Sequence, residues 1–321
     1  MNRISILDKQ SFNPSDFVIL TKDSPIVFFT IDKNYLVPAA ATIQSVLNAH
    51  SDLSIKIYLV ISGQEDTWMK PLVDMIQRAG KEVSVKKVNL EKFQALKINF
   101  HFSEANYFRL IAAELFEETR IIYLDSDILL RQDLLGLWQT DLGNFPLAAV
   151  RDFYVKDYNR LGLSESEGYF NSGIMLLNLD QWRKMNLGKK VLDFIRLFPQ
   201  RIQFADQCGL NGFLKGNWLA IHPKWNVQSE MITPQADFLD IPSPNLDLVE
   251  EAVSNPAIIH FTGPYKPWNL GCSNPYKKIF WETLQQTPLR KTLPLDFSVI
   301  NLLKSLLPRS MKKYYWRQLG E

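Results

Sequence analysis

The sequence of 321 residues contains only two cysteines, Cys208 and Cys272, and neither lies in a CxxC or a Cys/His spacing. Two cysteines do not make a disulfide framework, and zinc sites need a different spacing. A reducing cytosol fits this composition, and we expect both cysteines to be small buried apolar residues. Residues 26–42 contain no glycine. Sugar-phosphate nucleotidyltransferases need a glycine-rich phosphate loop early in the chain, so that class of enzyme is disfavoured.

Long apolar runs are also missing. No stretch of about 18 apolar residues occurs, so we expect no membrane-spanning helix. The first twenty residues lack the apolar core and the small-residue cleavage site of a secretory signal. The apolar content of 46% and the charged content of 22% are those of a folded globular protein.

Charge is unevenly distributed, although the net charge is only +2. Residues 288–321 contain seven Lys or Arg and two acidic residues, so the rest of the chain carries a net charge of −3. An apolar stripe with helical spacing runs through the same segment, at Val299, Leu302, Leu303, Leu306 and Leu307. Basic residues mixed with aromatic ones suit an anionic membrane surface, and the alternative is a terminal helix packed on the body. No nucleic-acid motif accompanies the charge, so we expect no nucleic-acid partner.

Strand and helix patterns alternate along the first half of the chain. Four segments are predicted to be strands, at 25–30, 55–60, 83–88 and 121–124. Helical stretches are predicted between them, at 39–47, 65–79 and 105–115. Short connections between strands and helices are typical of βαβ units. The sequence therefore predicts an α/β fold with a mostly parallel central sheet.

The second half is less regular. Strands are predicted at 146–150, 174–177 and 257–260, and a helix at 187–198. The segment YFNSG at 169–173 is expected to precede the second of these strands. Residues 223–256 are rich in Pro, Asn and Asp, which predicts mostly loop.

Two carboxylates, Asp125 and Asp127, follow the predicted strand at 121–124. If the strand direction continues, both side chains point to the same side of the sheet. Oxygen ligands at the carboxyl end of a buried strand can hold a divalent cation, which can hold a diphosphate. A lone Asp-x-Asp is a weak signal, expected about once by chance in a chain of this length. Its interpretation therefore depends on the other motifs.

A second polar cluster, at residues 32–35, ends the first predicted strand. Because ligands of parallel sheets collect beyond the carboxyl ends of the strands, both clusters are candidates for one site. Asp32 also suits a helix N-cap, and the two roles are compatible.

Seven motifs together resemble glycosyltransferase family 8, which includes bacterial lipopolysaccharide and lipooligosaccharide glucosyl- and galactosyltransferases. They are DKNY at 32–35, YFRL at 107–110, YLDSD at 123–127, YFNSG at 169–173, DQ at 206–207, NGFLKG at 211–216, and HFTG with KPW at 260–268. The motifs occur in family order over residues 25–285. The resemblance implies a Rossmann-like nucleotide-diphospho-sugar transferase fold of GT-A type over residues 1–285, with a basic amphipathic helical tail at 286–321.

The resemblance also implies an activity. Family members move a hexose, glucose or galactose, from a UDP-sugar to a glycan with retention, and a lipopolysaccharide or other cell-surface acceptor is expected here. Basic aromatic tails in the family bind membranes, which implies a cytoplasmic protein attached to the inner face of the membrane. The alternative is an inactive glycan- or nucleotide-sugar-binding protein of the same fold. Such a protein should lack a metal or donor residue, and none of those residues is missing.

The resemblance assigns a metal site to Asp125, Asp127 and His260. Mixed oxygen and imidazole ligation suits Mn²⁺, with Mg²⁺ as the second choice. For His260 alone, a satisfied core histidine is the competing interpretation. Residues implied to contact the donor are Asp32, Asn34, Tyr35, Arg109, Asp125, Ser126, Gly263 and Lys266. For Arg109, an ion pair with Glu104 or Glu114 is the alternative.

The catalytic residues implied by the resemblance are Asn171 and Gln207 beside the anomeric carbon, Asp206 on a sugar hydroxyl, and Asp152 near the donor. Retaining glycosidases use a carboxylate nucleophile, and here an amide, Gln207, occupies that place. An amide is a poor nucleophile. We therefore favour front-face attack by the acceptor hydroxyl with the leaving phosphate as base, and keep Asp152 or Asp206 as a covalent nucleophile as the alternative.

Overall fold

The structure is a computed structural model that describes residues 24–63, 66–93, 104–232, 243–264 and 266–306. The basic and aromatic residues expected after position 306 lie outside the described residues. Both cysteines are buried, as expected.

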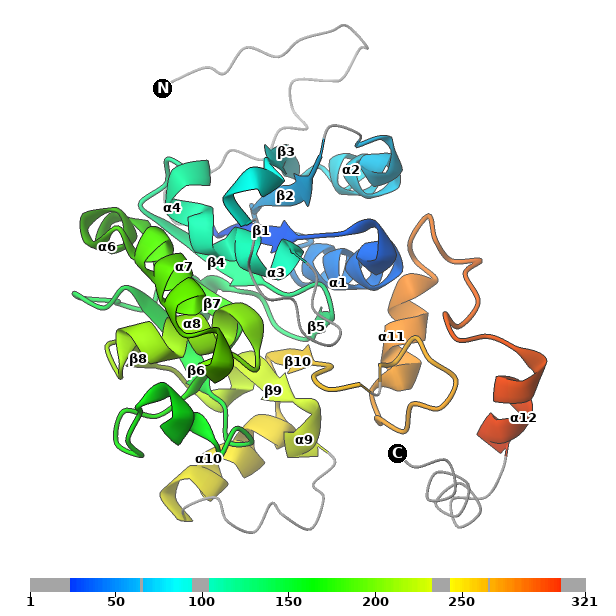
Figure 1. Cartoon of the computed structure of the whole chain (residues 1–321). Coiled ribbons are helices and arrows are strands. Elements are labelled where there is room, and N and C mark those ends of the chain that lie inside the picture. Colours follow the sequence, from blue (N-terminus) through cyan, green and yellow to red (C-terminus); the bar gives the residue numbers. More distant parts are fainter. Residues whose placement is uncertain (1–23, 64–65, 94–103, 233–242, 265, 307–321) are drawn as a thin grey trace, which may run out of the picture.

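Seven strands form the central sheet in the order β3-β2-β1-β4-β7-β6-β8 (Figure 1). The strands are β1 (Ile26–Thr30), β2 (Lys56–Ser62), β3 (Glu82–Val88), β4 (Arg120–Leu124), β6 (Leu147–Arg151), β7 (Phe170–Asn178) and β8 (Leu219–Ala220). Neighbours pair in parallel from β3 to β4 and between β6 and β8, whereas β7 runs antiparallel to β4 and β6. The predicted α/β fold with a mostly parallel sheet is confirmed.

Helices cover both faces of this sheet (Figure 1). One face carries α1 (Leu36–Ala49), α2 (Lys70–Arg78) and α11 (Lys277–Leu284), and the other carries α6 (Leu179–Met185), α7 (Leu187–Leu197) and α8 (Ala205–Leu214). Because side chains alternate along a strand, β1 supplies both cores. Val27 and Phe29 enter the first core, and Phe28 enters the second.

A second, small sheet brings distant segments together. It consists of β5 (Ile128–Leu130), β10 (Ile258–His260) and β9 (Val227–Gln228), in that order. β10 is antiparallel to β5, and His260 pairs with Ile128. The Phe261 N–H also donates to the carbonyl of Asp127 over 3.0 Å. This pairing places a histidine directly beside the two aspartates of the β4–β5 turn.

Helix α1 supports that turn through two buried hydroxyls. The Thr42 Oγ1 atom lies 2.9 Å from the Ser126 carbonyl oxygen and 2.8 Å from that of Ile128. Ser45 Oγ accepts from the Leu130 N–H over 3.0 Å. Buried backbone groups need partners, and these hydroxyls supply them where the chain leaves β4. The turn is therefore held rigidly against α1.

Predictions for the segments 105–115 and 169–173 were wrong in detail. The single helix expected at 105–115 is three short pieces, α3 (Ala105–Phe108), a 3₁₀ turn (Arg109–Ile111) and α4 (Ala112–Leu115). The backbone tightens where the Arg109 side chain turns into the protein interior. The YFNSG segment does not precede its strand, because β7 already begins at Phe170.

Residues 223–256 contain more structure than the predicted loop. The segment holds a 3₁₀ helix (Pro223–Asn226), β9, α9 (Ser229–Ile232) and α10 (Ser243–Ser254), with 233–242 outside the described residues. Pro223 and Pro244 lie in the first turns of helices, where proline is favoured. Proline content alone therefore misled the prediction.

The chain after α11 leads to α12 (Val299–Leu306), which agrees with the helical stripe predicted there. The remaining α-helix of the described part is α5 (Leu135–Trp138). Among the described residues, no helix combines the length and the apolar character that crossing a bilayer requires.

Candidate active site

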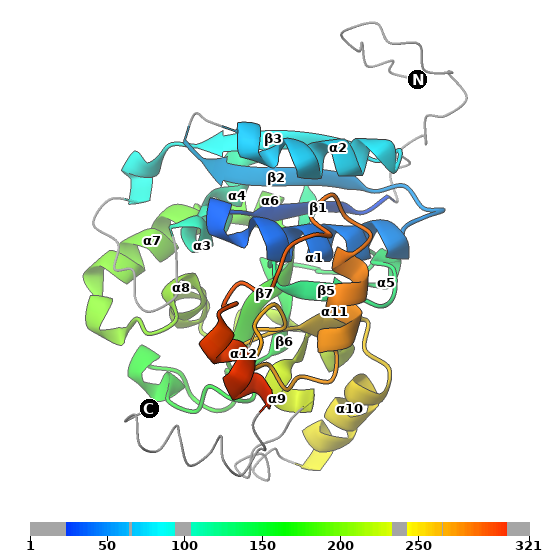
Figure 2. The ribbon, with the colours of Figure 1, turned by 90° about the vertical axis from the view of Figure 1, so that its right-hand side faces the viewer.

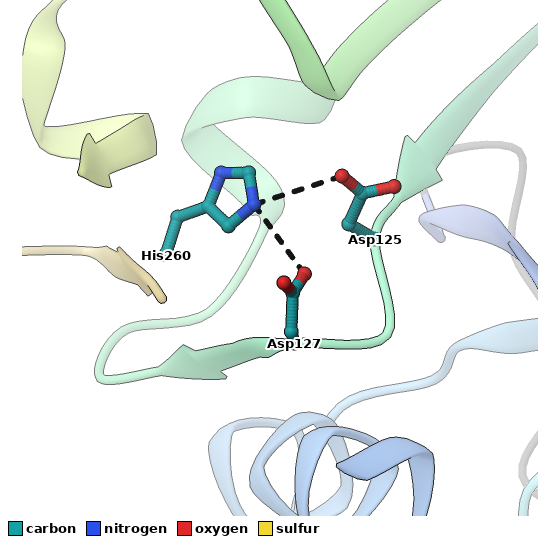
Figure 3. A group of neighbouring side chains, drawn as sticks. All are labelled: Asp125, Asp127 and His260. Atoms are coloured by element: carbon teal, nitrogen blue, oxygen red, sulfur yellow. Dashed lines mark ion pairs between the residues drawn. The ribbon is translucent and has the colours of Figure 1, made fainter. Parts of the chain in front are cut away.

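Asp125, Asp127 and His260 converge just beyond the carboxyl end of β4, the middle strand of the central sheet (Figure 3). The His260 Nε2 atom lies 3.6 Å from Asp125 Oδ2 and 3.4 Å from Asp127 Oδ1. Each of the three residues offers one candidate ligand atom, and these three atoms lie within 4.8 Å of one another. Two carboxylates and an imidazole at this spacing suit a divalent cation such as Mn²⁺. The strand does not continue through the aspartates as expected, because β4 ends at Leu124, and the turn itself brings both carboxylates to His260.

Gly173 on β7 provides the space for this cluster. Its carbonyl accepts from the Asp125 N–H over 2.8 Å. A Cβ atom at position 173 would overlap Cε1 of His260 and lie 2.7 Å from Asp125 Oδ2. The imidazole and the carboxylate thus fill the volume that any larger residue would need.

Lys266 lies against the same cluster. Its Nζ atom is 2.6 Å from Asp127 Oδ2 and donates to the Phe261 carbonyl. Burial raises the pKa of Asp127, but Lys266 and His260 outweigh it and hold that pKa below its ordinary value. Gly263, between His260 and Lys266, has a φ of 72°, which favours glycine. The lysine expected near the diphosphate therefore lies beside the candidate metal site.

Arg109 is buried between two carboxylates. Its Nη2 is 3.0 Å from Asp125 Oδ1, and its Nε is 3.3 Å from Asp206 Oδ2. The guanidinium also stacks on the Tyr123 ring, 4.0 Å from the centroid. It faces the aspartate cluster, whereas the sequence had left pairing with Glu104 or Glu114 open.

Asp152, Asn171 and Gln207 form a hydrogen-bonded group next to the cluster. Asp152 Oδ2 accepts from Asn171 Nδ2 and from Gln207 Nε2, both over 3.3 Å. Asp152 Oδ1 accepts from the N–H groups of Tyr154 and Val155. Burial raises the pKa of Asp152. Both of its oxygens are engaged, which leaves this carboxylate poorly placed as a free nucleophile.

Asp206 is held in a different way. Its Oδ2 accepts from the Ser172 hydroxyl over 2.9 Å and pairs with Arg109. Burial raises the pKa of Asp206 to about 6, although the positive charge of Arg109 opposes the shift.

Asp32, which the sequence predicted to contact the donor, is the N-cap of a 3₁₀ helix (Lys33–Tyr35). Its Oδ1 accepts from the N–H groups of Asn34 over 2.8 Å and of Tyr35 over 3.2 Å. The Tyr35 ring packs edge-on against Trp268, with centroids 5.8 Å apart. Burial, Asp127 and Asp125 together raise the pKa of Tyr35. Trp268 follows Lys266 by two residues, and Lys266 contacts Asp127, so residues 32–35 border the same site.

Sequence reasoning missed Asn226, a fully buried residue at the centre of the site. Asn226 Oδ1 lies 2.9 Å from His260 Nδ1, and Asn226 Nδ2 donates to Asn171 Oδ1 over 2.9 Å. The only available signal was a polar residue between the apolar Trp225 and Val227, inside a segment predicted as loop. Glu230 lies close to Gly263, since its Oε1 would be 3.2 Å from a Cβ atom at that position. It was not identified either, because it also falls in the segment predicted as loop.

Known proteins match this chain over most of its length. General stress protein A of Bacillus subtilis (strain 168) is 29% identical over 265 residues, which are 80% of this chain and 91% of that protein. The lipopolysaccharide 1,2-glucosyltransferase of Escherichia coli (strain K12) is 27% identical over 285 residues, with coverage of 87% and 82%. The crystal structure of the galactosyltransferase LgtC with donor and acceptor sugar analogues aligns with a TM-score of 0.74 at 27% identity, covering 84% of this chain and 98% of that one.

The model of glycosyl transferase family 8 matches residues 26–271. This range contains the aspartates of the β4–β5 turn, the amide side chains of Asn171 and Gln207, and also His260 and Lys266. The chain therefore belongs to glycosyltransferase family 8.

Proposed function

We propose that the protein transfers glucose or galactose from a UDP-sugar to a lipopolysaccharide or another cell-surface glycan, with retention and with a divalent cation. Family membership supports glycosyl transfer. The observation that carries the finer proposal is the convergence of Asp125, Asp127 and His260 beside Lys266. Carboxylate and imidazole ligands next to a lysine suit a cation-bound diphosphate.

In this proposal Asp125, Asp127 and His260 would hold Mn²⁺, or Mg²⁺ as the second choice. The bound cation would offset negative charge on the departing UDP. Lys266 would add a second positive charge within reach of the same diphosphate. The remaining donor contacts would come from Asp32, Asn34, Tyr35, Arg109, Ser126 and Gly263.

The two side-chain amides of Asn171 and Gln207 support front-face attack by the acceptor hydroxyl. Gln207 and Asn171 would flank the anomeric carbon, and Asp206 would hold a sugar hydroxyl. Asp152 has both oxygens occupied by four donors, so its role as a covalent nucleophile has less support than its role as an anchor for the two amides. The acceptor hydroxyl would then transfer its proton to the leaving phosphate.

Calorimetric titration of UDP-glucose and UDP-galactose tests this proposal. We expect binding with Mn²⁺ present, binding that is at least about tenfold weaker after chelation, and release of UDP once a glycan acceptor is added. The tighter donor identifies the hexose. Absence of binding under every condition would contradict the proposal, and binding without turnover would favour the alternative of an inactive sugar-nucleotide-binding protein.

We also propose that residues 286–321 attach the protein to the cytoplasmic face of an anionic membrane, as a segment apart from the catalytic domain at 1–285. Six exposed large apolar residues fall within ten positions, namely Leu293, Leu295, Phe297, Val299, Ile300 and Leu302. Figure 2 shows α12 on the same side of the molecule as α11. A cleft of about 790 Å³, lined by Arg78, Arg290 and Lys291 among others, lies between α2 and the segment after α11. Apolar and basic groups on one side of the protein suit an anionic bilayer.

The double variant Val299→Ser/Ile300→Ser is expected to bind anionic vesicles at least about tenfold more weakly, because two side chains no longer enter the acyl region. Val299 and Ile300 are 70% and 66% exposed, so the fold should be unaffected. Sedimentation with phosphatidylglycerol vesicles measures the effect. Leu197→Ser, at a site that is 71% exposed on α7, is the control and should bind like the unaltered protein. Equal binding of all three proteins would contradict this assignment.

A further inference from the structure

Beyond the ligands themselves, a chain of side-chain amides connects the backbone of β7 to His260. It starts at the backbone of β7, where the Gly173 N–H donates to Asn171 Oδ1 over 3.0 Å. A backbone N–H can only donate, so this bond identifies the oxygen of the Asn171 amide. The other atom, Asn171 Nδ2, faces the Asp152 carboxylate, which accepts. Both ends of Asn171 are therefore determined by partners with a single possible role.

The direction of the next bond follows. Asn171 Oδ1 also contacts the side chain of Asn226 over 2.9 Å, and an oxygen acceptor needs a donor there, which is Nδ2 of Asn226. The oxygen of Asn226 then faces His260 Nδ1 over 2.9 Å. Since an amide oxygen only accepts, Nδ1 of His260 carries the proton. With the proton on Nδ1, a bound cation would take the lone pair of Nε2, the atom that faces Asp125 and Asp127.

We propose that Asn226 is a positioning residue that sets the tautomer and the ring direction of His260 and thereby the affinity of the site for a divalent cation. This inference rests on the proposed metal site. Asn226 is fully buried, so water does not replace it as the partner of Nδ1. Partners of metal-bound histidines contribute in this way, and their loss lowers metal affinity by about 10- to 100-fold. The same chain joins the metal ligand to Asn171, which lies next to Asp152.

Two substitutions separate this role from a packing role. Asn226→Leu keeps the approximate volume and removes both hydrogen bonds. Asn226→Asp keeps an acceptor for the Nδ1–H of His260. Its second carboxylate oxygen, however, replaces the donor to Asn171 Oδ1 with another acceptor. We expect Mn²⁺ affinity to fall about 10- to 100-fold in Asn226→Leu and to stay within about threefold of the unaltered protein in Asn226→Asp. Calorimetry with Mn²⁺ alone gives these values without donor or acceptor.

Nitrogen NMR of protein labelled with ¹⁵N-histidine reads the tautomer directly. The sequence has four histidines, and His260→Ala identifies the ring signals of His260 by their absence. In metal-free protein, at a pH at which the His260 ring is neutral, we expect the Nδ1–H form for His260, and a shift toward the Nε2–H form in Asn226→Leu. This readout does not depend on sugar transfer, so it stays informative if the proposed donor or acceptor is wrong.

Three results would overturn the inference. One is an Nε2–H tautomer of His260 in the unaltered protein, which needs no variant and so remains available if Asn226→Leu fails to fold. Another is Mn²⁺ affinity in folded Asn226→Leu that equals that of the unaltered protein. The third is weak Mn²⁺ binding in both variants, because both lose the bond from Asn226 Nδ2 to Asn171 and only Asn226→Asp keeps the acceptor oxygen for His260.

Discussion

Replacement of Gly173 by alanine is expected to lower divalent cation affinity and glycosyl transfer by at least about 100-fold. The added methyl group would overlap Cε1 of His260 and lie 2.7 Å from Asp125 Oδ2 and 3.0 Å from Asn171 Oδ1. The imidazole cannot move aside at low cost, because Nδ1 is bonded to Asn226 and the ring is buried. One methyl group therefore displaces two candidate ligands at once.

Calorimetry with Mn²⁺ and a UDP-release assay measure the effect of Gly173→Ala. Gly271→Ala is the matched control, since a Cβ there meets no atom within 4 Å. Thermal unfolding shows whether Gly173→Ala retains its fold. A folded Gly173→Ala protein that binds Mn²⁺ like the Gly271→Ala control would refute the arrangement of the candidate site.

The second large effect concerns stability. Gly188→Ala is expected to reduce the free energy of unfolding by about 3 kcal/mol, the upper part of the range for overpacked positions. A Cβ at position 188 would overlap the backbone carbonyl oxygen of Leu110 and lie 3.0 Å from its carbonyl carbon. Backbone atoms cannot rotate away as a side chain can. Helix α7 would have to separate from the 3₁₀ turn at Arg109–Ile111.

Urea unfolding of Gly188→Ala and Gly271→Ala measures this difference. The control should change the free energy of unfolding by less than about 0.5 kcal/mol, as exposed positions do. Because the displaced turn carries Arg109, we expect transfer activity to fall even where the protein is folded. Unfolding midpoints that coincide for the two variants would show that α7 and the turn adapt to the methyl group.

Local patterns in the sequence were sufficient for much of the fold. Apolar runs predicted β1, β2, β4, β6 and β10, because buried strands of a covered sheet need continuous apolar residues. The aspartates, His260 and Lys266 were identified as candidates because metal and phosphate chemistry allows few residue types. Their order along the chain matched one family. Each of these properties is carried by a residue and its near neighbours, so it can be read without knowing the fold.

Other features depend on contacts between distant segments. His260 reaches Asp125 and Asp127 because β10 pairs with β5, not because a strand continues through the aspartates. Asn226 lies beside His260 because β9, which directly follows Asn226, pairs with β10. The prolines of this segment had suggested a loop. The need for glycine at 173 and 188 arises from His260 and Leu110, which lie far away in the sequence. Hydrogen-bond partners and excluded volume are properties of pairs of atoms in space, and only the folded chain defines those pairs.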